Sequence, residues 1–217
     1  MKCTLCNALL RNKIDKYYYV CSTCGAYVKD KKYYINASQE KCRYEEHNND
    51  INDSGYQKFT SPITDVILEN FNSTHRGLDY GCGTGPVISE VLKNRGYNIK
   101  LYDPYFYADG DYLNYSYDYI FSCEVFEHFF HPKREIEKLL SLLKPNGYLI
   151  IMTHLYDKKT DFSTWYYRND QTHVFIYTPK TIHFIAKNFN LDIKVLDDRV
   201  TVLKKTVCNS EQSATFC

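Results

Sequence analysis

A glycine-rich turn near the middle of the chain carries the strongest chemical signal. Three glycines alternate with other residues in the run GCGTG at 81–85, and Asp79 precedes this run by two positions. Glycine permits positive φ and lets the backbone approach a ligand closely. The free N–H groups at the start of a following helix would point at that ligand. The turn therefore predicts a cofactor site.

A second acidic residue, Asp103, follows the next apolar stretch of the chain. A carboxylate at this place can accept hydrogen bonds from both hydroxyls of a ribose, as in dinucleotide sites. The dinucleotide fingerprint GxGxxG itself fails, because Pro86 occupies its last glycine position. GxGxG with an acid two residues earlier is the pattern of sites for S-adenosylmethionine (SAM), an amino acid joined to a nucleoside. Asp79 would suit its ammonium and sulfonium charges.

Four of the nine cysteines form two CxxC pairs, Cys3 with Cys6 and Cys21 with Cys24. Paired thiolates at this spacing predict a closed tetrahedral zinc site, which supports folding or binding and leaves no open position for chemistry. The alternative, a redox dithiol, needs one reactive pair and gains nothing from a second. The odd cysteine count and the lack of a secretory signal favour a reduced, cytoplasmic chain.

Strands and helices must alternate around these residues to bring them together. The sequence predicts strands at 77–80, 97–102, 117–122, 148–153, 191–196 and 199–205, and helices at 86–95, 132–144 and 178–189, with another starting at Pro62. Such alternation predicts an α/β fold with a mostly parallel, doubly wound sheet. The last two strands are too close for a crossover helix, so they should form an antiparallel hairpin.

From about 76 to 205 the chain resembles class I SAM-dependent methyltransferases. Two further blocks, YDYIFSCEVFEH at 117–128 and LLKPNGYL at 142–149, are similar to the corresponding blocks of small-molecule methyltransferases, the ubiquinone-biosynthesis O-methyltransferases among them. Asn146 stands where that family usually has glycine, and asparagine tolerates the same turn. The resemblance implies a Rossmann-like sheet of seven strands. The usual third strand is hard to find within 104–116, which leaves the adenine contacts, with Asp111 and Tyr112 as candidates, unassigned.

The turn and the resemblance together imply a set of cofactor-binding residues, namely Asp79, Gly81, Cys82, Gly83, Gly85, Asp103, Pro104, Cys123 and Glu124. In the quinone O-methyltransferases a set similar to Glu124, Glu127 and His128 can hold a divalent ion. The alternative is that Glu127 pairs structurally and His128 packs at a helix start. His128 is also a candidate contact for the substrate.

The long segment between 153 and 178 is the candidate acceptor loop, since long loops in compact domains are commonly functional. Part of it resembles the WxYxxDxTHVxxY stretch of a bacterial methyltransferase subfamily that also carries an N-terminal four-cysteine module. Trp165, Tyr167 and Arg168 are the candidate substrate contacts. Asp170 would orient His173 as the general base. The alternative is that the aromatic residues pack the loop onto the sheet, Arg168 pairs with Asp170, and His173 caps a turn.

The chain divides into four segments on these patterns: a zinc ribbon at 1–36, a helical linker or lid at 37–75, the methyltransferase domain at 76–205 and a loose tail at 206–217. Residues 1–35 carry a charge of +5 and the rest −4. Lid candidates are His47, Asn48, Asn49, Tyr56 and Phe59.

The 217 residues carry 24% charged side chains and a net charge of +1. This balance argues against a protein that coats nucleic acid. No apolar run approaches the ~18 residues of a membrane span. A small-molecule methyl acceptor is therefore favoured, and the oligomeric state is left open.

The sequence leaves two alternative functions open. The first is an RNA or protein methyltransferase that docks its substrate on the basic, tyrosine-rich ribbon. The second is a non-catalytic zinc-binding adaptor with a degenerate SAM fold, against which the intact glycine turn and Asp103 argue.

Overall fold

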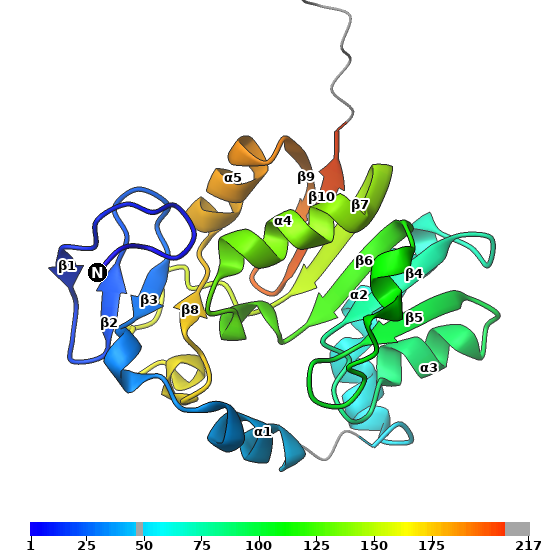
Figure 1. Ribbon diagram of the computed structural model, residues 1–217, viewed down its shortest axis with the longest axis horizontal. Coiled ribbons are helices and arrows are strands. Elements are labelled where there is room, and N and C mark those ends of the chain that lie inside the picture. Colours follow the sequence, from blue (N-terminus) through cyan, green and yellow to red (C-terminus); the bar gives the residue numbers. More distant parts are fainter. Residues whose placement is uncertain (47–49, 207–217) are drawn as a thin grey trace, which may run out of the picture.

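The computed structural model describes residues 1–46 and 50–206 and contains two β-sheets (Figure 1). The larger sheet has six strands in the order β5-β4-β6-β7-β10-β9. Their bounds are β4 (Arg76–Tyr80), β5 (Asn98–Tyr102), β6 (Tyr117–Cys123), β7 (Leu143–Met152), β9 (Leu191–Leu196) and β10 (Val200–Lys205). The first four strands run parallel, and β10 pairs antiparallel with both β7 and β9. The doubly wound α/β fold and its final hairpin are confirmed.

The described sheet has one strand fewer than the seven expected. In place of a third strand, the segment after Asp103 forms the 3-10 helix η2 (Gly110–Asn114), which the side chain of Asp109 caps at the Asp111 N–H. Tyr112 of η2 is buried and packs its ring 4.0 Å from that of Tyr102. An aromatic side chain of η2 therefore packs against the last residue of β5.

Helices cover both faces of the large sheet because side chains alternate along its buried strands. On one face Tyr119 and Phe121 pack with α2 (Ser54–Asn70) and α3 (Val87–Lys93). On the other, Ile120 and its neighbours pack with α4 (Pro132–Leu142) and α5 (Pro179–Asn188), each of which starts with proline at its first position.

The start predicted for α2 at Pro62 is wrong. The helix begins at Ser54, because the carboxylate of Asp53 accepts hydrogen bonds from the N–H groups of Gly55 and Tyr56. Capping by a side chain decides where a helix begins, and Pro62 lies inside the helix.

The N-terminal segment forms a four-stranded sheet together with a strand from the other end of the chain. Strands β1 (Asn12–Lys13), β2 (Tyr18–Val20) and β3 (Tyr27–Lys29) are completed by β8 (Phe175–Ile176), which pairs antiparallel with β3. The four paired cysteines lie in one apolar cluster with residues of α4 and α5. Residues 1–36 are therefore built into the fold and share its core; we call them the N-terminal module.

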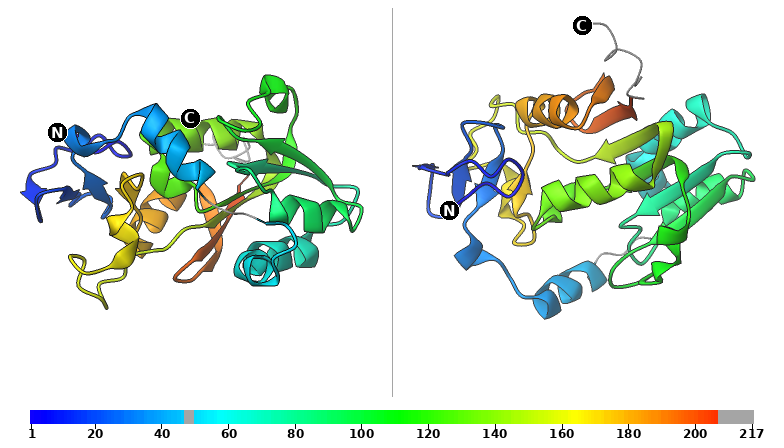
Figure 2. Two further views of the ribbon diagram at one scale, coloured as in Figure 1. Left: turned by 90° about the horizontal axis from the view of Figure 1, so that it is seen from below. Right: turned by 45° about the horizontal axis from the view of Figure 1, so that its top comes forward.

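Helix α1 (Ala37–Glu45) links this module to α2 and lies apart from the helices on the two faces of the large sheet, at the bottom of the right view (Figure 2). It starts with a capping box in which Asn36 and Gln39 exchange hydrogen bonds. The lid candidates at 47–49 and the tail at 207–217 lie outside the described residues. No helix in the described part of the chain is long and apolar enough to span a bilayer.

Candidate active site

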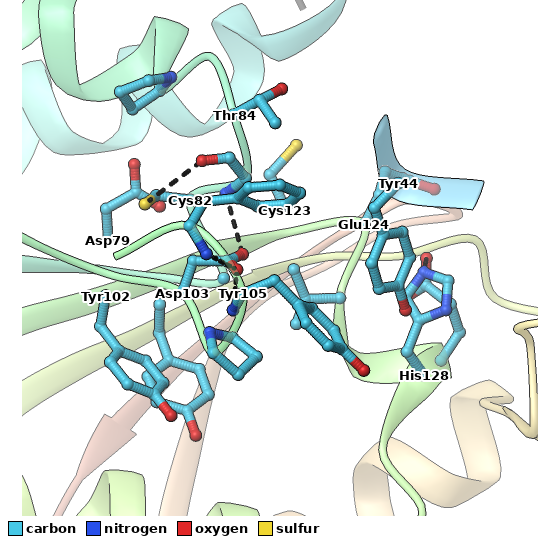
Figure 3. A pocket seen from close by; sticks show the side chains of 18 of the residues that line it. Tyr44, Asp79, Cys82, Thr84, Tyr102, Asp103, Tyr105, Cys123, Glu124 and His128 are labelled. Carbon is cyan, nitrogen blue, oxygen red and sulfur yellow. Dashed lines mark hydrogen bonds and ion pairs between the residues drawn. The ribbon is translucent and has the colours of Figure 1, made fainter. Parts of the chain in front are cut away.

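A cavity of about 730 Å³ lies at the carboxyl ends of β4, β5 and β6, where doubly wound sheets bind their ligands. In Figure 3, Asp79, Cys82 and Asp103 lie on one side of it, and Glu124 and His128 on the other. All nine predicted cofactor residues line this one cavity. Its size is ordinary for a cofactor or substrate pocket.

The glycine turn depends on two left-handed backbone positions, Gly81 with φ 84° and Gly83 with φ 63°. A Cβ on Gly81 would lie 2.5 Å from the side chain of Val125. The N–H groups of Gly81 and Cys82 donate to the carbonyl of Tyr102, at 2.8 and 3.1 Å. Only glycine fits this tight turn, which is tied to the neighbouring strand and leaves the cavity open above it.

Asp103 is held at the edge of the cavity by backbone donors. Its carboxylate accepts hydrogen bonds from the N–H groups of Gly83, Tyr105 and Phe106, at 3.0, 2.8 and 3.1 Å. Charged acceptors with several backbone partners are fixed in orientation. The carboxylate is thus pre-positioned, and its remaining lone pairs are available to ribose hydroxyls.

Asp79 is a buried carboxyl group on the floor of the cavity. Burial raises its pKa to about 7, and Ser89 donates a hydrogen bond to it at 2.6 Å. A buried carboxyl with a raised pKa is stabilised in its ionised form by a cation placed beside it. This environment suits the ammonium group of an amino-acid ligand.

Two glutamates, Glu127, which is buried, and Glu124, which is half-buried, line the cavity on the side away from the glycine turn. Glu124 takes the positive φ of 52°, and its Oε2 accepts a hydrogen bond from the hydroxyl of Tyr167 at 3.0 Å. Glu127 Oε2 accepts from Thr153 at 2.8 Å. The Oε1 atoms of both glutamates are buried and have no hydrogen-bond partner among the described residues. Burial raises the pKa of Glu124 to about 8 and that of Glu127 to about 7.

Two histidines converge on Glu127. The Nε2 atoms of His128 and His173 lie 3.8 and 3.9 Å from Glu127 Oε1. The Nδ1 atom of His173 lies 2.6 Å from the Tyr167 carbonyl, and that of His128 lies 3.2 Å from the Thr172 carbonyl. Because a carbonyl only accepts, each Nδ1 carries the hydrogen and each Nε2 keeps its lone pair.

His173 is a neutral imidazole at the wall of the cavity. Burial lowers its pKa to about 3, so its Nε2 is unprotonated near neutral pH. The expectation that Asp170 orients this ring is wrong. The Asp170 carboxylate accepts hydrogen bonds from Thr172 and Arg43, while the Tyr167 carbonyl orients the imidazole.

The predicted catalytic residues, Asp170 and His173, and the four predicted substrate contacts divide into two groups. His128, Asp170 and His173 line the cavity, whereas Trp165, Tyr167 and Arg168 are not among its described lining residues. The Arg168 guanidinium forms an ion pair with Asp15 of the N-terminal module, not with Asp170 as the alternative had it. The rings of Trp165 and Tyr167 pack against one another in a tilted arrangement, with centroids 5.1 Å apart. Tyr167 and Arg168 are therefore buried in the protein, and Trp165 is half-buried.

The sequence analysis missed the contribution of α1. Glu40 is buried and accepts hydrogen bonds from the hydroxyls of Tyr44 and Tyr105, both at 2.8 Å. The ring of Tyr44 stands edge-on to His128, with centroids 5.3 Å apart. Several of these side chains line the cavity, namely Glu40, Tyr44, Tyr105 and the lid candidates Tyr56 and Phe59. An acidic residue in an otherwise polar helix gives no sequence signal for burial.

The side chains that could hold a divalent ion are not the set predicted from the sequence. Glu127 and His128 have His173 as their neighbour, with the three ligand atoms within 4.8 Å of one another, and Glu124 is not in this group.

The four paired cysteines meet at one point of the N-terminal module. Cys3 and Cys24 Sγ are 3.6 Å apart, Cys6 and Cys21 Sγ are 3.4 Å apart, and all four sulfurs lie within 4.8 Å of one another. Four thiolates about 2.3 Å from a tetrahedral zinc ion would have similar separations, so the donor set fits that metal.

The doubly wound sheet, the glycine turn above its strand ends and the carboxylate at Asp103 define an α/β protein of the SAM-binding class. A family model described as a methyltransferase domain matches residues 53–195. The chain therefore belongs to the methyltransferase-domain family, and it is a SAM-dependent methyltransferase.

Comparisons with individual proteins agree with this family. The ubiquinone biosynthesis O-methyltransferase of Rickettsia prowazekii (strain Madrid E) is 28% identical over 176 residues, which are 66% of this chain and 69% of that protein. Human N-acetylserotonin methyltransferase, solved in complex with SAM, matches with a TM-score of 0.52 and 16% identity, over 70% of this chain and 54% of its own. This chain thus spans about half of the human protein.

A third protein is similar over nearly the whole chain. The 1,6-didemethyltoxoflavin-N1-methyltransferase of Burkholderia thailandensis, solved with 1,6-didemethyltoxoflavin and S-adenosylhomocysteine, has a TM-score of 0.53 and 13% identity. The match covers 92% of this chain and 100% of that one. At such identities the two solved structures show the shared fold.

Proposed function

We propose that the protein transfers a methyl group from SAM to a small-molecule acceptor. The observation that carries this proposal is the single cavity in which the predicted cofactor residues and the neutral His173 meet. The cavity is walled on its outer side by α1 and α2, which suits a small acceptor better than a polymer. The proteins similar to this chain are named for small acceptors.

The residues of the chain have separate tasks in this proposal. SAM, when bound, supplies a methyl group already activated on a sulfonium. Asp103 binds the ribose hydroxyls, and Asp79 binds the ammonium group. His173 Nε2 accepts the proton that a hydroxyl or amine acceptor loses on methylation, and Glu127, in its ionised carboxylate form, stabilises the resulting imidazolium through Oε1 at 3.9 Å. The rest of the cavity wall holds the acceptor in line, which is the main contribution a protein makes to such a displacement.

The test is to incubate the protein with methyl-labelled SAM and an extract of the source cells. We expect the label in the small-molecule fraction. Label in RNA or in protein would instead support the alternative in which the N-terminal module docks a polymer. No transfer to any fraction, together with no SAM binding in calorimetry, would contradict the proposal.

The raised pKa of Asp79 predicts that SAM affinity depends on pH. The carboxyl must be ionised to bind an ammonium group, and in the free protein it ionises only around pH 7. Affinity should therefore rise as pH increases from 5.5 to 7, by about tenfold. Calorimetric titration at several pH values measures this. In Asp79→Asn the affinity should be weaker and flat over that range; an equal rise in this variant would remove Asp79 as the cause.

The second component of the proposal is one zinc ion held by Cys3, Cys6, Cys21 and Cys24. Elemental analysis should find one zinc per chain. Cys24→Ser should lose it and destabilise the protein by about 3 kcal/mol or more, since structural zinc contributes directly to folding. Thermal unfolding measures the loss, with Cys42→Ser, an exposed thiol on α1, as the matched control. Zinc retained in Cys24→Ser would contradict the assignment.

A further inference from the structure

The acceptor loop contacts residues of the N-terminal module that do not line the cavity. The hydroxyl of Tyr18, a fully buried residue of β2, donates a hydrogen bond to the His173 carbonyl at 2.8 Å. The same hydroxyl lies 3.4 Å from the Arg168 carbonyl. One side chain of the module thus contacts the backbone of the residue whose imidazole faces the cavity.

Lys29, from the neighbouring strand β3, reaches the same loop. It is only 5% exposed, and its ammonium group donates to the carbonyls of Asp170 and Gln171 at 3.2 and 2.8 Å. Burying an ammonium group is unfavourable unless it is hydrogen-bonded. Here the hydrogen-bond acceptors are two backbone carbonyls of the loop. Nothing in zinc binding or in the local β-sheet requires that arrangement.

Two more contacts hold the ends of the loop. Asp15 of the module forms an ion pair with Arg168 at the start of this stretch. At its end, the Lys29 N–H donates to the Val174 carbonyl at 2.9 Å, and β3 pairs with β8 directly afterwards. The backbone on both sides of His173 is therefore set by the first thirty residues of the chain.

We propose that the N-terminal module is a positioning element for methyl transfer, with Tyr18 and Lys29 as its positioning residues. They fix the backbone of 168–174 and thereby place His173 Nε2 relative to the acceptor. This inference rests on the proposed role of His173 as the base. A displacement of the reacting groups by about 1 Å can cost on the order of 10²-fold in rate, so small changes in the module should alter turnover.

The experiment compares Lys29→Met and Tyr18→Phe with the wild type. Turnover is measured with labelled SAM and the small-molecule fraction of the source-cell extract, and SAM affinity by calorimetry. We expect turnover to fall at least about tenfold in each variant, with SAM affinity unchanged within about twofold, because neither residue contacts the cofactor cavity. Lys13→Met and Tyr17→Phe, which alter exposed parts of the module, are the matched controls.

A double-mutant cycle separates positioning from a general structural effect. In a His173→Asn background, Lys29→Met and Tyr18→Phe should cause no further loss, because residues that act through one group are not additive. A loss by the same factor in both backgrounds would overturn the inference. So would wild-type turnover in both module variants. If Lys29→Met does not fold, Tyr18→Phe alone decides the question, since it removes a single hydroxyl.

The same cycle keeps the two proposals apart. If His173→Asn lowers turnover but the module variants do not, the inference fails and the role of His173 stands. If His173→Asn itself has wild-type turnover, the role of His173 fails. In that case the ¹⁵N spectrum of the His173 imidazole still reports position, and an unshifted signal in both module variants would exclude any positioning by the module.

Discussion

His173→Asn should lower turnover by about 10²-fold or more while leaving SAM affinity unchanged. Asparagine can still donate a hydrogen bond to the Tyr167 carbonyl, as the imidazole Nδ1 does at 2.6 Å, so the loop should keep its shape. What the substitution removes is Nε2, the lone pair beside Glu127 Oε1. General-base catalysis by a positioned side chain typically contributes 10²–10⁴-fold. The measurement is single-turnover methyl transfer at saturating SAM.

The matched control for this variant is His183→Asn, an exposed histidine on α5. It should be indistinguishable from the wild type. A separate comparison adds a chelator to the wild type, because Glu127, His128 and His173 also have the donor spacing of a cation site. Turnover that survives the chelator but not His173→Asn supports proton transfer. Turnover that survives both would exclude His173 as the base.

The cofactor half of the cavity could be predicted from sequence because its geometry is local. A strand, a glycine turn and a helix follow one another at 76–93, and Asp103 follows the next strand. Parallel strands place such turns at one sheet edge. Gly81 and Gly83 are the two residues whose positive φ the turn requires. The glycine pattern in the sequence therefore predicts the backbone conformation of the turn directly.

The acceptor half could not be predicted, because its partners are distant in the chain. The aspartate nearest to Arg168 in sequence is Asp170, but its ionic partner is Asp15. Asp170 pairs with Arg43 of α1. Periodicity and spacing carry no information about which of several carboxylates a guanidinium will meet after folding. The same limit applies to Glu40, whose burial depends on two tyrosines contributed by different segments.

Departures in the fold have similarly specific causes. Proline is common at the first position of a helix, but α2 begins at the Asp53 cap, nine residues before Pro62. The sequence shows no clear third strand within 104–116, and the structure has the 3-10 helix η2 there. The tilted packing of Tyr112 against Tyr102, with ring centroids 4.0 Å apart, could not be inferred from composition.

Asp103→Ala should weaken SAM binding by about 100-fold. The ribose hydroxyls would donate two hydrogen bonds to this carboxylate, and bonds to a charged group contribute about 1.5–3 kcal/mol each. A loss of about 3 kcal/mol corresponds to roughly 100-fold in the dissociation constant. In the wild type the carboxylate also accepts hydrogen bonds from three backbone N–H groups, those of Gly83, Tyr105 and Phe106. In Asp103→Ala these groups would hydrogen-bond to water, which adds to the loss of affinity. Calorimetric titration with SAM measures it.

A ligand analogue tests whether the ribose is the partner of Asp103. The wild type should bind S-adenosylhomocysteine about 100-fold more tightly than its 2′,3′-dideoxy analogue, by the same two charged hydrogen bonds. Asp103→Ala should bind both equally weakly, because the group that distinguishes them is gone. Asp192→Ala, on the exposed face of β9, should discriminate as the wild type does. Full discrimination retained in Asp103→Ala would show that the ribose lies elsewhere, since a group that only shapes the glycine turn would weaken both ligands alike and leave their ratio unchanged.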